Sequence, residues 1–123
     1  MRRLVVLSVL LGFAGCVTPS IPIPPPDPSK MSFAVGTDGS GSIVSASLRY
    51  PSTTAYAGGL VYVFNRSKGK GIIELVNSDD SIGPTTPVEA SASDQLVVSV
   101  ESDEQTVSTC VLLQEGTPAS YCP

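Results

Sequence analysis

The side chains with the greatest capacity for covalent chemistry in this sequence are three cysteines, Cys16, Cys110 and Cys122. The 123 residues include no histidine, which is the commonest general base and the commonest metal ligand. Two thiols without histidine do not complete a tetrahedral zinc site. These residues therefore favour attachment or cross-linking over catalysis, and we expect neither a metal nor a cofactor.

The other polar side chains show no catalytic pattern. Serine is frequent, but neither a nucleophile-elbow motif nor a Ser-x-x-Lys pair occurs in a plausible setting. Glu101, Asp103 and Glu104 resemble an acid pair for glycoside chemistry, yet adjacent carboxylates in an expected turn are usually solvated. We therefore expect a protein that is not an enzyme.

Two acidic loops offer oxygen ligands of the kind that calcium prefers. They are "GTDGSGS", with Asp38, and "NSDDS", with Asp79 and Asp80. Neither matches the spacing of a known calcium loop, so plain turns are the first interpretation and calcium binding the alternative.

The N-terminus has the organisation of an export signal. Two arginines precede an apolar run over residues 4–11, and the small residues Ala14 and Gly15 follow it. A membrane-spanning helix needs about 20 apolar residues, more than this run contains. We therefore expect residues 1–15 to be a signal peptide.

The motif "FAGC" at residues 13–16 resembles the lipobox of bacterial lipoproteins, although Phe13 stands where that family prefers leucine. The resemblance implies that the chain is cut after Gly15 and that Cys16 carries a diacylglyceryl group and usually an acyl group such as palmitate. Val17 replaces the aspartate that retains enteric lipoproteins at the inner membrane, so the resemblance implies a lipid anchor in the bacterial outer membrane. The alternative is an ordinary secretion signal with an incidental Cys16.

A proline-rich segment follows the cysteine. Residues 17–30, "VTPSIPIPPPDPSK", contain six of the eleven prolines. Proline lacks an amide donor and favours extended polyproline II, in which fourteen residues reach about 40 Å. We expect residues 16–30 to tether a domain at residues 31–123, with recognition by an aromatic groove as the alternative.

The remaining residues predict an all-β fold, a small antiparallel β-sandwich of about seven strands. Candidate strands occupy residues 32–35, 42–50, 60–65, 71–76, 87–91, 96–102 and 106–114. Alternation with period two points Leu96, Val98 and Val100 inward. The third and the last strands are apolar on both faces, which is typical of central strands.

Part of this domain resembles the Ig-like and carboxypeptidase-regulatory-like β-sandwich modules of bacterial surface proteins. The residues that carry the resemblance are Gly59, Val61, Val63, Asn65, Asp94, Leu96, Val98 and Val100. It implies a fold and no activity, because one fold hosts many functions.

Cys110 and Cys122 remain as an even pair in an oxidising compartment. A disulfide between them would fasten the C-terminal tail to the last strand and stabilise the domain by up to about 3 kcal/mol. A buried thiol and a free thiol in the tail are the alternatives.

The charge limits the partners. The net charge is −4, and five basic against eleven acidic residues remain after residue 15. Nucleic acid is therefore an unsuitable partner, since Lys and Arg supply most of that affinity. We expect a lipid-anchored, non-catalytic binding or structural module of the cell envelope, bound to membrane lipid through Cys16 and to an envelope protein or glycan. The alternative is an accessory subunit of a secretion, adhesion or polysaccharide machine.

Overall fold

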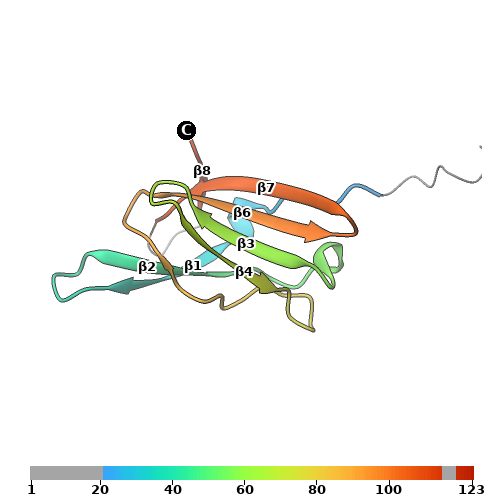
Figure 1. Ribbon diagram of the computed structural model, residues 1–123, viewed down its shortest axis with the longest axis horizontal. Helices are drawn as coiled ribbons and strands as arrows, with labels where there is room; N and C mark the ends of the chain where they lie inside the picture. Colours follow the sequence, from blue (N-terminus) through green and yellow to red (C-terminus); the bar gives the residue numbers. More distant parts are fainter. Residues whose placement is uncertain (1–20, 115–118) are drawn as a thin grey trace, which may run out of the picture.

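Two antiparallel β-sheets make up the computed structural model, which describes residues 21–114 and 119–123 (Figure 1). The three-stranded sheet has the order β1 (Ser32–Thr37), β2 (Ile43–Arg49), β5 (Val88–Glu89). The five-stranded sheet has the order β4 (Lys70–Leu75), β3 (Leu60–Asn65), β6 (Gln95–Ser102), β7 (Gln105–Leu112), β8 (Ser120–Tyr121). The all-β fold that the sequence predicts is thus confirmed, with eight strands in place of about seven.

The core lies between the sheets and follows the predicted alternation. Leu96, Val98 and Val100 of β6 are fully buried, each with 0% of its surface exposed. Strand β3 lies between β4 and β6, and β7 lies between β6 and β8. Both strands with two apolar faces are therefore flanked on each side, as the sequence predicts.

The eighth strand, β8, has no counterpart among the predicted strands. It contains two residues and pairs with the end of β7, where Val111 faces Tyr121. Two residues carry no periodicity, so the pairing depends on the neighbouring strand and on the adjacent Cys122 rather than on a local pattern.

The segment before β1 also lies on the sandwich. It includes a short 3-10 helix, η1 (Pro28–Lys30), and a second one, η2 (Thr54–Tyr56), lies beside the segment. The sequence assigns this segment to a spacer that holds the domain at a distance. In the structure, residues from Ile21 onward contact the sandwich.

Residues 1–20 lie outside the described part of the chain. The expected signal peptide, the lipidated Cys16 and the first residues of the tether belong to them.

Candidate functional site

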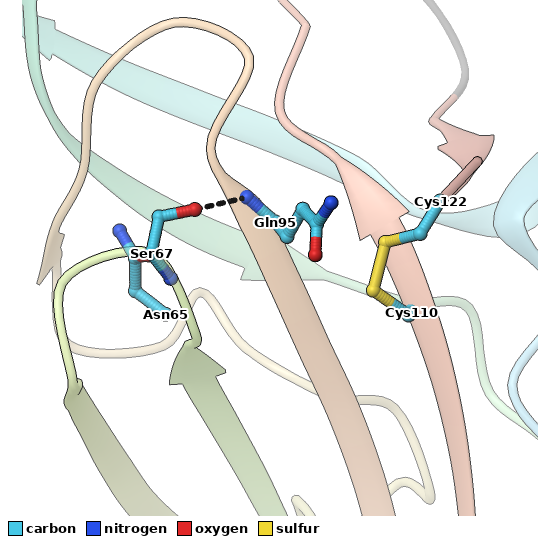
Figure 2. Close-up of a disulfide and its surroundings, with 5 residues drawn as sticks. All are labelled: Asn65, Ser67, Gln95, Cys110 and Cys122. Atoms are coloured by element: carbon cyan, nitrogen blue, oxygen red, sulfur yellow. Dashed lines mark hydrogen bonds between the residues drawn. A yellow bond between two sulfur atoms is a disulfide. The ribbon is translucent and has the colours of Figure 1, made fainter.

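Of the predicted site residues, Cys110 and Cys122 lie at disulfide distance (Figure 2). Their Cα atoms are 5.4 Å apart, and the residues are separated by 12 positions in the sequence. The Cys122 amide also donates a hydrogen bond to the Cys110 carbonyl oxygen at 3.0 Å. The two cysteines thus bring the C-terminal tail to β7 at the distance that the predicted disulfide requires.

One side chain of β7 holds the proline-rich segment at Ile21 and Ile23, the first part of it that the structure describes. The Gln105 amide nitrogen donates to the carbonyl oxygen of Ile21 at 2.8 Å, and its oxygen accepts from the Ile23 amide at 3.0 Å. A single amide group thus pairs with the backbone as a neighbouring strand would. Gln105 therefore fixes where this segment meets the sandwich.

Hydroxyl groups hold the middle of the segment. The carbonyl oxygens of Pro24 and Pro26 each accept a hydrogen bond at 2.6 Å, from Tyr56 and from Thr109. The Tyr50 hydroxyl accepts from the Asp27 amide at 3.0 Å. Burial, with Tyr50 close by, raises the pKa of Tyr56, so its hydroxyl remains a donor over the physiological pH range.

Apolar contacts complete this docking. Pro26 and Pro28 are buried, Ile23 packs against the core, and Met31 is part of it with 3% of its surface exposed. Proline cannot join a β-ladder, because it lacks the amide donor. Side-chain bonds to its carbonyls replace that ladder, so the segment closes one side of the sandwich without being a strand. The sequence signal for this is Ile23 alone, because Ile21 exposes 85% of its surface.

The outer face of the five-stranded sheet carries a second candidate site, which we call the apolar patch and define as Tyr62, Phe64, Ile73, Leu75 and Val97. Phe64, Ile73 and Leu75 expose 44%, 63% and 72% of their surfaces. A groove of about 510 Å³ is lined by Tyr62, Phe64, Ile73 and Val97 of the patch, and Leu75 lies outside it. Exposed apolar groups this close together are typical of a surface that binds another molecule.

The rim of the apolar patch is polar. The Tyr62 hydroxyl donates to a carboxylate oxygen of Glu101 at 2.7 Å, and this bond raises the pKa of Tyr62. The hydroxyls of Ser99 and Ser108 lie 2.6 Å apart on the same face. An apolar centre with a polar rim is the usual anatomy of a protein interface.

The β4 edge borders the apolar patch. Among the described residues β4 pairs with β3 alone. The Val76 amide donates to the Gly59 carbonyl, and from this pair every second residue of β4 forms its backbone hydrogen bonds with β3. Gly71, Ile73 and Leu75 therefore direct their backbone groups away from β3. Proteins commonly block such an edge with charge, proline or a bulge. In β4 the charges are Lys70 and Glu74, and Gly71, Ile72 and Ile73 between them carry none.

The resemblance residues Asn65 and Asp94 contact each other. The Asn65 side-chain nitrogen donates to a carboxylate oxygen of Asp94 at 2.8 Å, and its oxygen accepts from the Ser67 amide at 2.9 Å. Ser67 in turn accepts from the Gln95 amide at 3.0 Å, so the β3–β4 hairpin is fastened to the start of β6 (Figure 2). These two residues have a structural role in the fold.

The acidic loops are organised as turns. Asp38 accepts from the Ser40 amide at 2.8 Å, and Asp79 accepts from the Ser81 amide at 3.0 Å. Hydrogen bonds from these serines lower the pKa of both carboxyls. Within the described residues, no group of three or more Cys, Asp or Glu side chains is placed to hold a metal ion.

No helix in the described ranges is long and apolar enough to cross a membrane. The chain matches no protein-family model, no curated protein and no solved structure. What the protein does must therefore be inferred from its own sequence and contacts.

Proposed function

We propose that this chain is a lipid-anchored lipoprotein of the bacterial outer membrane whose β-sandwich is a non-catalytic binding module of the cell envelope. The observation that carries the proposal is the apolar run that ends in "FAGC" at Cys16. Ile21, only five residues later, already contacts the sandwich. Together they support a small domain joined closely to a lipid anchor.

The anchor has a sufficient driving force. Each buried methylene contributes about 0.8 kcal/mol, so two or three acyl chains hold a protein at a bilayer, whereas one chain binds only marginally. Lipid attached at Cys16 needs no basic surface on the domain to retain it. This agrees with the acidic net charge of −4.

We also propose that the sandwich is of the Ig-like or carboxypeptidase-regulatory-like kind. The hydrogen bond between Asn65 and Asp94 supports this, since both residues belong to the pattern on which the resemblance depends. The bond gives that pattern a physical reason. A shared fold does not identify the ligand, so the ligand has to be inferred from the surface of this domain.

The apolar patch favours a protein partner over a glycan, and with it the alternative role as accessory subunit of an envelope machine. Ile73 and Leu75 are aliphatic and exposed, and the open backbone groups beside them match an added strand. A glycan site would need more polar groups directed at sugar hydroxyls.

Intact mass spectrometry of the mature protein tests the anchor. The proposal expects a chain that begins at Cys16 with diacylglyceryl and acyl masses, and a protein in the outer-membrane fraction. The matched control is Cys16→Ser, which should be unlipidated and absent from that fraction. An unmodified mass for the wild-type chain would refute the lipoprotein proposal.

A photo-crosslinking amino acid at Ile73 tests the binding module, with one at Gly39, in the β1–β2 hairpin of the other sheet, as the control. The proposal expects one stoichiometric envelope protein to crosslink from position 73 but not from 39. It also expects the unlabelled Leu75→Lys variant to lose that protein on co-purification. Equal crosslinking from both positions would argue against the apolar patch as the binding surface.

A further inference from the structure

We infer that the end of the sandwich formed by the β6–β7 turn faces the bilayer at close range, and that the β1–β2 and β3–β4 hairpins face away from it. The inference rests on the proposed lipid anchor and specifies how that anchor presents the domain. Its basis is the docking of the proline-rich segment.

The docking shortens the tether. A free spacer over residues 17–30 would reach about 40 Å as polyproline II. Docking is in place at Ile21, so at most residues 17–20 lie between Cys16 and the docked segment. Five residue steps span at most about 18 Å when fully extended. The sandwich therefore has to lie near the lipid headgroups.

The docking also determines which end of the sandwich lies near the bilayer. Gln105, which holds Ile21 and Ile23, is the first residue of β7 and follows the β6–β7 turn. In Figure 1 the blue N-terminal segment reaches the sandwich beside this turn, on the right, whereas the β1–β2 hairpin projects to the left. A taut tether pulls the β6–β7 end toward the membrane.

The opposite end is well removed from the anchor. The Arg66 amide donates to the Gln95 carbonyl, so the β3–β4 hairpin lies at the start of β6, and the β6–β7 turn lies at its end. Strand β6 has eight residues, which corresponds to about 27 Å at 3.4 Å per residue. The β3–β4 hairpin thus lies more than about 20 Å along β6 from the β6–β7 turn, on the side away from the anchor.

Electrostatic attraction would give the reverse orientation. Exposed Asp103 and Glu104 form the β6–β7 turn and are repelled by anionic headgroups. The basic cluster of Arg66, Lys68 and Lys70 is at the other end, where Lys68 pairs with Asp94 and Lys70 with Glu89. Even with these pairs, a domain oriented by charge alone would present this hairpin to the membrane rather than the turn with its two carboxylates. The tether and the charge make opposite predictions, which allows a clear test.

The test places one fluorophore at each end of the lipidated protein. Thr106→Cys marks the near end, because Thr106 is exposed beside the β6–β7 turn. Gly39→Cys marks the β1–β2 hairpin, where an added side chain meets nothing within 4 Å. The native disulfide leaves the introduced thiol free for labelling. Each labelled protein is added to preformed vesicles that contain a lipid with a nitroxide on its headgroup.

The inference expects several-fold stronger quenching at position 106 than at position 39, independent of salt. A matched variant carries a 20-residue Gly-Ser insertion after residue 18, which gives the domain a mean reach of about 25 Å. This variant should lose most of the difference. Equal quenching at both positions, or stronger quenching at position 39, would overturn the inferred orientation. If the mass of the same protein includes the lipid, the proposed function would still stand. A mass without lipid would overturn both.

Discussion

The hydroxyl oxygen of Tyr56 lies 2.6 Å from the carbonyl oxygen of Pro24 and donates a hydrogen bond to it. The bond joins η2 to a segment whose composition is that of a free spacer. The Thr109 hydroxyl donates the same kind of bond to the carbonyl oxygen of Pro26, two residues further along the segment. Side-chain donors from the sandwich thus satisfy carbonyls that could not be part of a β-ladder, and this keeps the segment in place.

We predict that Thr109→Val destabilises the domain. Valine keeps the shape of threonine but removes the donor, so the carbonyl of Pro26 loses its partner inside the protein. An unsatisfied buried acceptor costs about 1–3 kcal/mol. Urea unfolding followed by circular dichroism measures the free energy of unfolding.

Thr106→Val is the matched control for this prediction, because Thr106 is exposed on the same strand. Its effect on the free energy of unfolding should stay within about 0.5 kcal/mol. Equal effects at both positions would contradict the role given to the Thr109 hydroxyl. Faster proteolysis of residues 21–31 in Thr109→Val alone would locate the effect in the docked segment.

The strands could be predicted because their signals are local. Strand β3 has the predicted bounds, Leu60–Asn65, and the inward residues of β6 alternate as expected. Turn residues and period-two alternation act over a few positions and survive in the folded state. The docking of residues 21–30 depends instead on side chains that lie 23 to 84 positions away in the chain, from Tyr50 to Gln105. No local pattern encodes such a contact.

The candidate site was predictable only in part. Cysteine pairing follows from number and compartment, so Cys110 and Cys122 could be assigned from the sequence. The apolar patch could not, because an apolar residue on a strand with two apolar faces is expected to be covered on both. Phe64 is 44% exposed because the second sheet covers only the inner face of β3. The order of the strands in the two sheets determines which faces are covered, and that order depends on the whole chain rather than on a local pattern.

The disulfide should contribute strongly to stability. We predict that the double variant Cys110→Ala, Cys122→Ala lowers the free energy of unfolding by about 3 kcal/mol, because the cross-link restricts the unfolded chain. For a domain of this size that is a fall in Tm of about 10–20 °C. Calorimetry with and without reductant provides the comparison. Reductant should lower the Tm of the wild type and leave the double variant unchanged, and an unchanged wild type would disprove the cross-link.

Stability should depend on pH through Asp94. Its partial burial acts to raise its pKa, but hydrogen bonds from Asn65 and the Ser91 amide, with Lys68 nearby, hold the pKa below its ordinary value of 3.8. A carboxyl whose pKa is lowered by folding stabilises the protein above pH 3.8. That contribution is lost as the pH falls through the folded-state pKa.

We therefore predict that Asp94→Asn costs about 1–2 kcal/mol at pH 7, since bonds to a charged acceptor are the stronger ones. The difference between variant and wild type should shrink as the pH falls below about 4. Urea titrations at several pH values measure it. Asp103→Asn, in the exposed β6–β7 turn, is the control and should change stability by less than about 0.5 kcal/mol. A difference for Asp94→Asn that is the same at pH 3 and pH 7 would rule out the charge as its cause.

Two leucines separate the role of the core from that of the apolar patch. Leu96 is fully buried in β6, whereas Leu75 in β4 is 72% exposed. We predict that Leu96→Ala lowers the free energy of unfolding by about 2–5 kcal/mol, through lost burial and a cavity. Leu75→Ala should lower it by no more than about 0.5 kcal/mol.

Binding should show the opposite order. Truncation of an interface anchor commonly costs more than about 1 kcal/mol of affinity, so Leu75→Ala should weaken capture of the partner while its unfolding curve remains that of the wild type. Denaturant unfolding and crosslinking from position 73, measured on the same preparations, separate the two effects. A large loss of stability in Leu75→Ala would mean that the β4 edge is structural. Unchanged capture by a stable Leu75→Ala would move the binding surface elsewhere.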